Sequence, residues 1–319
     1  MPVYNGADYL RKTLANVSIL EQKKFEIIII DDGSTDDSGV ILREYCATHE
    51  NSRLIFSDHK GVSKARNIGL THVKGDYILF LDSDDQFYAD VFEVLERNIH
   101  EYSADIIVFG ANVISYDPRC VLADIEPRDI LYRRFEVSAL FDEVGARPYV
   151  WNCAYKTEFV KNNKLCFDEE ISLGEDQLFQ FCAFPKAETI QFLKDKLYRY
   201  NFLANGVSNK EYFINTFCRC KLHIKLVEKI IVAFRPYDNC VQMQKALYLW
   251  IYDFLHNDFF SLNKSEYKEI SFTFKKMLQK HKIDILKLPV PFKKKLCYYS
   301  LCSSFFKNIK NFFKANRRA

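Results

Sequence analysis

The chain has 319 residues, of which 48% are hydrophobic and 27% are charged, which excludes a disordered protein and suffices for one large domain with a smaller one. Its formal net charge of +3 is too small to indicate a nucleic-acid-binding protein, and we expect no nucleic-acid partner. Residues 290–319 carry Lys and Arg but no Asp or Glu, so the C-terminal end is expected to lie near an anionic partner.

Helical and strand patterns alternate over the first part of the chain. The expected helices are 9–20, 37–48, 62–74 and 88–102, and the expected strands are 26–30, 53–56, 77–81 and 105–109. This alternation predicts an α/β fold with a mostly parallel sheet flanked by helices. Pro2 to Gly6 resemble the loop that follows a first strand, and we expect that first strand to be missing.

The second part of the chain has a different pattern. The strand signal weakens over 126–150, where we expect an insertion over the site. No strand is expected after residue 209, and helices are expected at 220–234 and 241–260. A boundary near 206–210 therefore divides the chain into a first domain, residues 1–207, and a helical C-terminal region, residues 208–319.

Two of the expected strands end in clusters of acidic residues. The clusters are Asp31 and Asp32 after strand 26–30, and Asp82, Asp84 and Asp85 after strand 77–81. Unpaired buried charge is costly, so these side chains are not expected in the core. Ligands of open α/β sheets bind at the carboxyl ends of the strands, and grouped carboxylates suit a hard cation. The clusters therefore predict a site for Mg²⁺ or Mn²⁺ with a phosphorylated substrate.

Ten cysteines are present, without a Cys-x-x-Cys pair or the Cys/His spacing of a zinc site. No signal peptide follows Met1, and no uncharged apolar stretch is long enough to span a bilayer. These features predict a cytoplasmic protein with reduced thiols.

Five motifs occur together in the first 205 residues. They are Pro2-Val3-Tyr4-Asn5, Asp31-Asp32-Gly33-Ser34-Thr35-Asp36, Ala65-Arg66-Asn67-Ile68-Gly69-Leu70, Gly75-Asp76-Tyr77-Ile78 with Leu81-Asp82-Ser83-Asp84-Asp85, and Gly174-Glu175-Asp176. In order and spacing they resemble family 2 glycosyltransferases of the GT-A fold, of the kind that builds bacterial surface glycans. The resemblance implies a GT-A nucleotide-sugar-binding and catalytic domain at 1–207, followed by the smaller helical region.

The resemblance also implies an activity. It is that of a metal-dependent, inverting hexosyl- or N-acetylhexosaminyltransferase that takes a sugar from a nucleotide donor, with UDP as the expected nucleotide. The acceptor would be a saccharide or a lipid-linked saccharide in surface polysaccharide synthesis. Asp84 would contact the Mg²⁺ or Mn²⁺ ion and Asp82 the ribose or the metal, with Asp85 as a further candidate ligand. Capping of the following helix remains open for Asp84 and Asp85.

Other positions match the nucleotide-binding part of the family pattern. Asp32 matches the residue that reads uracil, whose imide N–H a carboxylate can accept. Pro2, Tyr4 and Asn5 match the loop beside the base, although core packing remains open for Tyr4. Arg66 matches a contact to the diphosphate or nucleotide, and an ion pair with nearby acids is the alternative.

A third set matches the acceptor side. Asp176 matches the base that takes the proton from the acceptor hydroxyl, and Glu175 is expected to position the acceptor. Trp151 fits a position beside the acceptor sugar. Helix capping by Asp176 and core packing of Trp151 are the alternatives.

Two departures from the family pattern concern the compensation of charge. Cys153 stands where the family often has Lys, and the loop at 203–208 contains no Lys, Arg or His. We therefore expect neutralisation of the diphosphate to rest on the metal and Arg66.

The C-terminal tail predicts a basic amphipathic helix. Tyr298, Leu301, Phe305, Ile309 and Phe312 share one helical face, and lysines flank them. Such a helix can lie on an anionic membrane surface, which would place the protein peripherally on the inner face of the cell membrane near lipid-linked acceptors. Packing of this helix on its own domain is the alternative.

Two other functions are compatible with the sheet architecture. A sugar nucleotidyltransferase would need a Gly-rich, Arg-containing loop that residues 2–8 lack. A non-catalytic glycan- or nucleotide-binding scaffold would not need the acids at positions 84 and 176, both of which are present.

Overall fold

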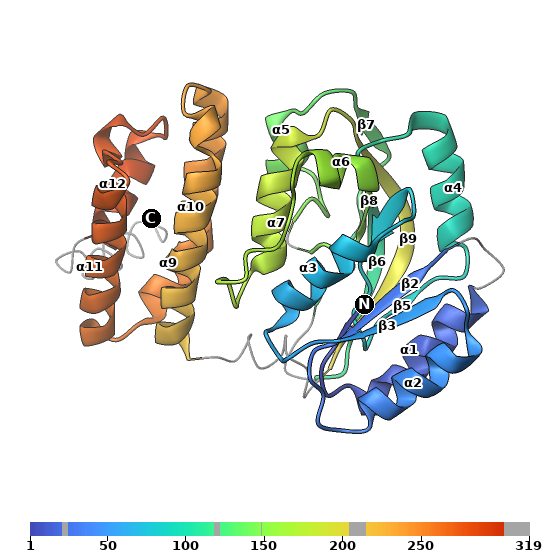
Figure 1. The fold of residues 1–319 in the computed structure, drawn as a ribbon. Coiled ribbons are helices and arrows are strands. Elements are labelled where there is room, and N and C mark those ends of the chain that lie inside the picture. Colours follow the sequence, from blue (N-terminus) through green and yellow to red (C-terminus); the bar gives the residue numbers. More distant parts are fainter. Residues whose placement is uncertain (21–24, 118–121, 148, 204–214, 303–319) are drawn as a thin grey trace. The chain divides into compact units, whose positions relative to one another are not determined.

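The computed structural model describes residues 1–20, 25–117, 122–147, 149–203 and 215–302. The chain forms two compact units, Met1–Lys210 and Glu211–Ala319. The first unit contains the sheets, and the described part of the second consists of helices (Figure 1).

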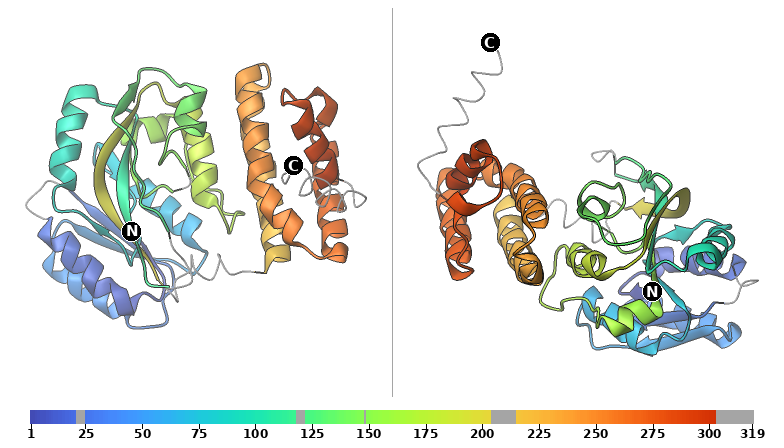
Figure 2. Two further views of the ribbon diagram at one scale, coloured as in Figure 1. Left: turned by 180° about the vertical axis from the view of Figure 1, so that it is seen from behind. Right: turned by 90° about the horizontal axis from the view of Figure 1, so that it is seen from above.

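A parallel three-stranded sheet opens the first unit. Its strands are β1 (Pro2–Val3), β2 (Ile27–Asp31) and β3 (Ser52–Phe56), in the order β1-β2-β3. The connecting helices α1 (Ala7–Ile19) and α2 (Ser38–Thr48) pack together, and α3 (Val62–His72) packs on β1 and β2 from the opposite face (Figures 1 and 2). The two crossovers through α1 and α2 step along the sheet in the same direction, so both helices lie on one face. After β3 the chain turns back along the sheet, and α3 therefore lies on the opposite face, because such crossovers are right-handed.

The predicted α/β fold with a parallel sheet is confirmed, but one local prediction is wrong. Pro2 and Val3 were expected in a loop, whereas they form β1 and pair with Ile30 and Asp31. Val3 is buried. Residues 2–3 are extended because they pair with β2. Two residues are too few to show the alternation by which a strand is predicted.

The second sheet is mixed, with strand order β4-β8-β6-β9-β5 and β7 paired to β9. Its strands are β4 (Tyr77–Leu79), β5 (Gln86–Phe87), β6 (Ile106–Ser115), β7 (Ile130–Tyr132), β8 (Cys153–Lys156) and β9 (Ile190–Phe202). Only β6 and β9 run parallel, and the remaining neighbours are antiparallel. β8 comes from a segment without a clear strand pattern, so its pairing was not predicted.

Short helices connect and cover this sheet. They are α4 (Val91–Tyr102), α5 (Val137–Phe141), α6 (Thr157–Asn162), α7 (Glu175–Ala183) and the 3₁₀ turn η1 (Phe184–Lys186). The predicted helix at 88–102 begins at Val91, because Gln86 and Phe87 pair with β9 before the helix starts.

The second unit is helical. Its elements are α9 (Thr216–Ala233), η2 (Arg235–Tyr237), α10 (Val241–Ser261), α11 (Lys264–Lys280), η3 (Ile285–Lys287) and α12 (Phe292–Leu301). The predicted helices at 220–234 and 241–260 correspond to α9 and α10. Helix α11 begins at a capping box in which Asn263 and Glu266 satisfy each other's backbone N–H groups. Among the described helices, none is long and apolar enough to cross a membrane.

The start of the predicted tail helix packs inside this unit. Tyr298 and Leu301 are fully buried, and the Tyr298 hydroxyl donates a hydrogen bond to the Tyr248 carbonyl of α10. The prediction that these two side chains face a membrane is therefore wrong, because they belong to the helical core. Phe305, Ile309 and Phe312 lie outside the described residues, as does the loop at 204–208.

Candidate functional site

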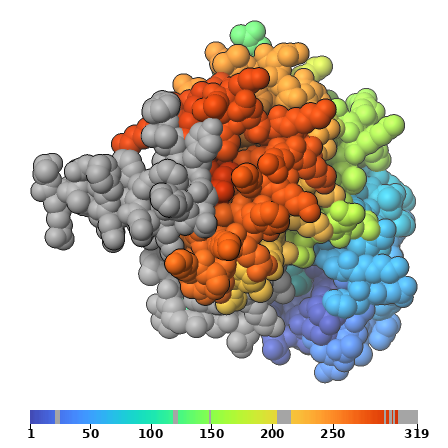
Figure 3. Space-filling model, turned by 90° about the vertical axis from the view of Figure 1, so that its left-hand side faces the viewer, coloured from blue at the N-terminus to red at the C-terminus, as the bar shows by residue number. Residues whose placement is uncertain are grey.

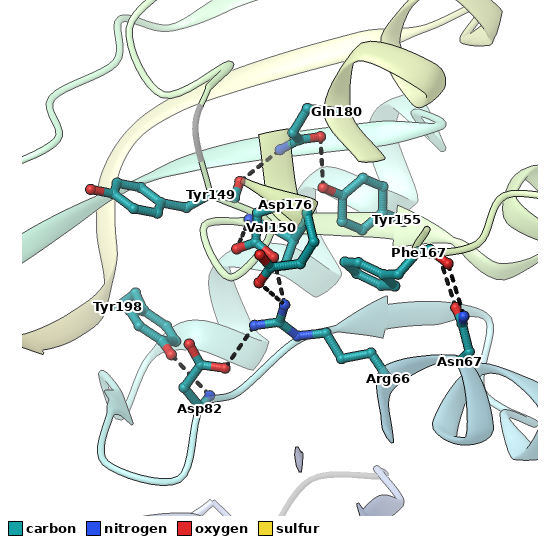
Figure 4. A network of polar contacts seen from close by, with 11 residues as sticks. Arg66, Asn67, Asp82, Tyr149, Val150, Tyr155, Phe167, Asp176, Gln180 and Tyr198 are labelled. Atoms are coloured by element: carbon teal, nitrogen blue, oxygen red, sulfur yellow. Dashed lines mark hydrogen bonds and ion pairs between the residues drawn. The ribbon is translucent and has the colours of Figure 1, made fainter. Parts of the chain in front are cut away.

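One arginine gathers three of the predicted site acids. Arg66, on α3, is 6% exposed. Its Nη1 donates to Asp176 Oδ1 at 2.5 Å and to Glu175 Oε1 at 3.1 Å, and its Nη2 donates to Asp82 Oδ1 at 3.1 Å (Figure 4). Of the two interpretations of Arg66, the ion pair with nearby acids is therefore the one present in the structure. The guanidinium joins the turn after β4 to the first turn of α7.

The Arg66 side chain is also held by its apolar surroundings. Its guanidinium lies 5.2 Å from the centre of the Phe167 ring. The next residue, Asn67, receives a hydrogen bond from the Phe167 N–H at 2.8 Å and donates one to the Phe167 carbonyl at 2.9 Å (Figure 4). These contacts fix the segment before α7 against α3, and they thereby hold the side chain of Asp176 in position relative to Arg66.

Asp176 lies in the first turn of α7, where its Oδ2 accepts the Val150 N–H at 3.3 Å. Burial raises the pKa of Asp176 well above its ordinary value, and the charges of Glu175 and Asp82 act in the same direction, while Arg66 opposes them. Capping of α7 by Asp176 is wrong, because Gly174 occupies the cap position. Asp176 is thus a half-buried acid that takes up a proton more readily than a surface carboxylate.

The three acids after β4 have three different environments. Asp85 is fully buried and accepts hydrogen bonds from the Tyr198 hydroxyl at 2.9 Å and the Asn201 N–H at 2.7 Å. Asp85 as a metal ligand is wrong, because its oxygens are engaged by β9. Helix capping by Asp84 or Asp85 is also wrong, because Asp90 precedes α4.

Asp84 differs from its neighbours in having no partner for its carboxylate among the described residues. Burial, together with the charge of Asp82, raises the pKa of Asp84 to about 7. A partly buried carboxylate without a partner is unfavourable unless a proton or a cation joins it. Within the described ranges, no group of three or more His, Cys, Asp or Glu residues could hold a metal ion. Asp84 and Asp82 fit an ion that takes its other ligands from phosphate and water, as Mg²⁺ commonly does.

The residues predicted to contact the nucleotide base lie in β1 and at the ends of β1 and β2. Tyr4 is 45% exposed and stacks on His59, with ring centres 3.9 Å apart, so core packing of Tyr4 is wrong. Asn5 accepts the Thr35 N–H at 2.8 Å and donates its own N–H to Ser34 at 3.0 Å. Sequence reasoning missed His59, which has no motif of its own.

Asp32 and Asp31 organise the backbone at this edge. The two carboxylate oxygens of Asp32 accept the N–H groups of Lys60 and Gly61, at 2.9 and 2.7 Å. Asp31 accepts the Ser34 N–H at 2.9 Å, which closes the turn after β2. Both carboxylates are buried. Asp32 therefore holds the loop that carries His59. The N–H of a nucleotide base could bind only to lone pairs of the Asp32 carboxylate that the backbone N–H groups leave free.

Trp151 belongs to the core. It is 2% exposed, and the rings of Tyr149, Tyr198 and Tyr200 stack on it with centres 4.6, 4.5 and 5.0 Å away. The prediction that Trp151 lies beside the acceptor sugar is corrected, because no open ring face remains. The neighbouring Cys153 is also buried, which raises its pKa to about 12 and keeps the thiol neutral.

Comparison with known proteins finds similarity to glycosyltransferases. The model of the family Glycosyl transferase family 2 matches residues 1–137. Glycosyltransferase GlyG of Streptococcus pneumoniae is 33% identical over 220 residues, which cover 66% of this chain and 72% of GlyG. The uncharacterized glycosyltransferase EpsJ of Bacillus subtilis is 30% identical over 215 residues, which cover 66% of this chain and 62% of EpsJ.

The fold is similar to that of S. aureus TarS residues 1–349, solved in complex with UDP-GlcNAc. The TM-score is 0.67 at 19% identity, covering 96% of this chain and 90% of the TarS chain. The match spans less than two thirds of EpsJ and between 31% and 60% of several other curated relatives.

Replacing Arg66 tests the electrostatic role of the guanidinium. Arg66→Met leaves Asp82, Glu175 and Asp176 without their cation, so we expect a lower unfolding midpoint at neutral pH. Loss of the guanidinium raises the pKa of Asp176 further in the folded state, because Arg66 opposes the effect of burial. The unfavourable contribution of the charged Asp176 therefore disappears as pH falls and the group becomes protonated, and it grows as pH rises. Thermal unfolding of the variant between pH 5 and 8 measures this.

The matched control is Arg11→Met, because Arg11 is an exposed arginine. An Arg66→Met variant whose deficit in unfolding midpoint is the same at pH 5 and pH 8 would contradict the electrostatic role.

Proposed function

Because this chain belongs to glycosyl transferase family 2, we propose that it transfers a sugar from a UDP-linked donor to a hydroxyl group of a saccharide acceptor, with inversion at the anomeric carbon. The observation that carries the proposal is the contact of Arg66 with Asp82 on one side and with Glu175 and Asp176 on the other. It brings a donor-side acid and an acceptor-side acid to one buried arginine.

The donor assignment rests on the nucleotide-side geometry. Tyr4 and His59 offer an aromatic stack at the ends of β1 and β3, and Asp32 lies beneath the loop that carries His59. Asn5 ties the segment after β1 to Ser34 and Thr35 in the turn after β2, and Pro2 pairs with Ile30 in the sheet. The similarity in fold to TarS, solved with UDP-GlcNAc, supports a UDP-linked N-acetylhexosamine or hexose as the donor.

A divalent cation completes the donor site in this proposal. Asp84 and Asp82 would hold Mg²⁺ or Mn²⁺, which when bound offsets the charge that develops on the departing diphosphate. The carboxylate of Asp84, to which no other described residue donates a hydrogen bond, supports this assignment. Asp82 is positioned for the role by Arg66 and by the hydroxyl of Tyr198, to which its N–H donates at 3.3 Å (Figure 4).

Asp176 acts as the base. Inverting transfer needs one carboxylate to take the hydroxyl proton as the acceptor oxygen attacks the anomeric carbon from the face opposite the leaving group. Burial raises the pKa of Asp176, which brings it closer to the working pH and strengthens the base. Glu175 shares Nη1 of Arg66 with Asp176 and is placed to bind an acceptor hydroxyl. Arg66 positions both acids.

The acceptor is proposed to be a growing surface polysaccharide or a lipid-linked glycan, reached from the cytoplasmic face of the membrane. Residues 211–319 contain 21 Lys and Arg residues against 8 Asp and Glu residues, so the helical unit is strongly basic. A basic unit favours peripheral contact with anionic lipid, where such acceptors are anchored.

Helix α11 offers a defined surface for this contact. Phe272 is 67% exposed, and Lys268, Lys275 and Lys276 lie one turn away on the same helical face. Figure 3 shows the helical unit from the side of α11 and α12. Both acids of α11 are engaged, Glu266 in the capping box and Glu269 with Lys221 at 2.8 Å. The exposed face therefore combines an aromatic ring with positive charge, as interfacial helices do.

Asp84→Asn tests the metal assignment. Loss of the anionic ligand should weaken Mn²⁺-dependent binding of UDP by about 10-fold or more. Calorimetry measures the affinity without requiring the acceptor, and circular dichroism checks that the fold persists. Asp37→Asn, at an exposed acid, is the control. An Asp84→Asn variant with the parental affinity for UDP and Mn²⁺ would remove Asp84 from the metal site.

Asp176→Asn tests the base. The variant keeps the shape of the side chain, so UDP binding should persist while sugar transfer falls by about 10²-fold or more. In the parent chain the base works only when deprotonated, so kcat should decline as pH falls through a pKa above that of an ordinary Asp. Glu175→Gln is the companion variant and should raise KM for the acceptor more than it lowers kcat. Near-parental turnover of Asp176→Asn would place the base elsewhere.

Replacing Lys268, Lys275 and Lys276 together by Ala tests the membrane surface. Each lysine near an anionic surface contributes about 1 kcal/mol, so binding to phosphatidylglycerol vesicles should fall by about 100-fold. High salt should weaken the parent in the same direction. Vesicle co-sedimentation provides the measurement.

The control for this experiment removes Lys12, Lys74 and Lys161 of the first unit, which changes the net charge equally. Equal losses in the two triple variants would show that net charge and not the α11 surface determines binding.

A further inference from the structure

A buried polar network next to Asp176 joins α7 to β8 (Figure 4). Its centre is Gln180, which is fully buried and lies one helical turn after Asp176, so the two side chains share a face of α7. A buried amide is unfavourable unless its donors and its acceptor are engaged. The partners of Gln180 therefore explain its place in the core.

Each polar atom of the Gln180 side chain has a partner. Its Nε2 donates to the Tyr149 carbonyl at 2.7 Å and to Cys153 Sγ at 3.3 Å. Its Oε1 accepts the Tyr155 hydroxyl at 2.8 Å. A carbonyl can only accept a hydrogen bond, so the Tyr149 carbonyl determines which end of the amide faces it. The orientation of the Gln180 amide is therefore fixed.

The peptide group between Tyr149 and Val150 connects Gln180 to Asp176. Its carbonyl accepts the hydrogen bond from Gln180 at 2.7 Å, and its N–H donates to Oδ2 of Asp176 at 3.3 Å (Figure 4). A peptide group is planar and trans, so its C=O and N–H point in opposite directions. A donor that holds the carbonyl therefore also fixes the direction of the N–H.

The two carboxylate oxygens of Asp176 are held unequally. Oδ1 accepts from the charged guanidinium of Arg66 at 2.5 Å, whereas Oδ2 accepts from the neutral Val150 N–H at 3.3 Å. A short hydrogen bond from a charged donor stabilises the anionic form of an oxygen more than a longer one from a neutral donor. Oδ2 therefore keeps more of its basicity, and its second lone pair can receive a proton.

We propose that Gln180 is a positioning residue for sugar transfer, which acts through the Tyr149–Val150 peptide to present Oδ2 of Asp176 to the acceptor hydroxyl. This inference rests on the proposed function, because it takes Asp176 as the base. A lone pair of the acceptor oxygen forms the new bond to the anomeric carbon, and UDP leaves with the electron pair of the bond that breaks. The hydroxyl proton passes to Oδ2 and leaves its electron pair on the acceptor oxygen.

The network is electrically neutral, so it acts on Asp176 through hydrogen bonding. Burial raises the pKa of Cys153 to about 12 and raises the pKa of Tyr155 well above its ordinary value, so both stay protonated. The Val150 N–H lowers the pKa of Asp176 against the effect of burial. Among the described residues, the other titratable or charged groups that face Asp176 are Arg66 of α3, Asp82 after β4, Glu175 of α7 and Tyr149 before β8. Removing the Gln180 amide leaves all of these groups in place.

Gln180→Met tests the inference, with Tyr155→Phe as the matched control. Methionine is unbranched like glutamine but cannot hold the Tyr149 carbonyl. Tyr155→Phe removes a hydrogen bond of the same buried network and leaves the contact between Gln180 and Tyr149. The probe is UDP-GlcNAc with Mn²⁺ and water as the acceptor, and release of UDP gives kcat.

We expect Gln180→Met to lower kcat by about 10-fold with the affinity for UDP unchanged within about 2-fold, because the base is misplaced while the donor site is intact. Tyr155→Phe should lower kcat by less than about 2-fold, since the Tyr149 carbonyl keeps its donor. Equal losses of kcat in Gln180→Met and Tyr155→Phe would overturn the inference.

Combination with Asp176→Asn shows whether Gln180 acts through Asp176. In that background Gln180→Met should cause no further loss of kcat, because no base is left to position. The same loss in both backgrounds would overturn the inference and leave Asp176 as the base. Parental release of UDP by Asp176→Asn alone would instead contradict the proposed function, on which the inference rests.

Nuclear magnetic resonance of the parent chain tests the connection without substrate and without a Gln180 variant. As Asp176 titrates, the signals of the Val150 N–H and of the Gln180 side-chain amide should move with one midpoint, which lies above that of an ordinary aspartate. Asp176→Asn should abolish both movements. In Gln180→Met the Val150 midpoint should move to higher pH, because the hydrogen bond that favours the carboxylate is weakened. Gln180 signals that stay constant while the Val150 signal titrates would overturn the inference.

Discussion

The site depends on one guanidinium that faces three carboxylates. Asp82, Glu175 and Asp176 come from segments about ninety residues apart, and without a cation their mutual repulsion would separate the turn after β4 from α7. Arg66 is suited to this position because its planar group offers several donors at once and keeps its charge when buried. Phe167 and Asn67 then hold the arginine and the segment before α7 in place. The geometry of the acids is therefore set by α3, an element of the parallel sheet.

Contacts with β9 give the neighbouring acids after β4 different roles. Asp85 accepts hydrogen bonds from Tyr198 and Asn201, so it fixes the turn and does not face the site. Asp82 is bound by Arg66, and Asp84 is left without a protein partner among the described residues. The sequence analysis correctly placed these acids as a group at the end of a strand. It could not separate their roles, because the separation comes from a strand more than a hundred residues later.

The same reason explains which parts of the fold were predictable. Strands β2, β3, β4 and the start of β6 followed from local apolar runs, and α1 to α4 from their spacing, because those signals lie within each element. The family motifs predicted the glycosyltransferase family, which the relatives confirm. Trp151 and Tyr298 were misplaced, since an aromatic residue in a polar stretch has the same pattern whether it faces a ligand or a core. Their partners, Tyr198 and Tyr248, are distant in sequence.

Arg66 also lies between the polar site and an apolar cavity lined by residues of β2 and β4. Together with Leu81 and Ile30 it lines this cavity, while its guanidinium faces the acids. The two sheets thus meet through an ion-pair cluster at their carboxyl edge and through apolar walls below it. An ion pair at a buried junction loses hydration, so it is favourable only when its geometry is good and its remaining donors and lone pairs are hydrogen-bonded. The apolar side chains that line this cavity beside Arg66 therefore bear on how its guanidinium meets Asp82 and Asp176.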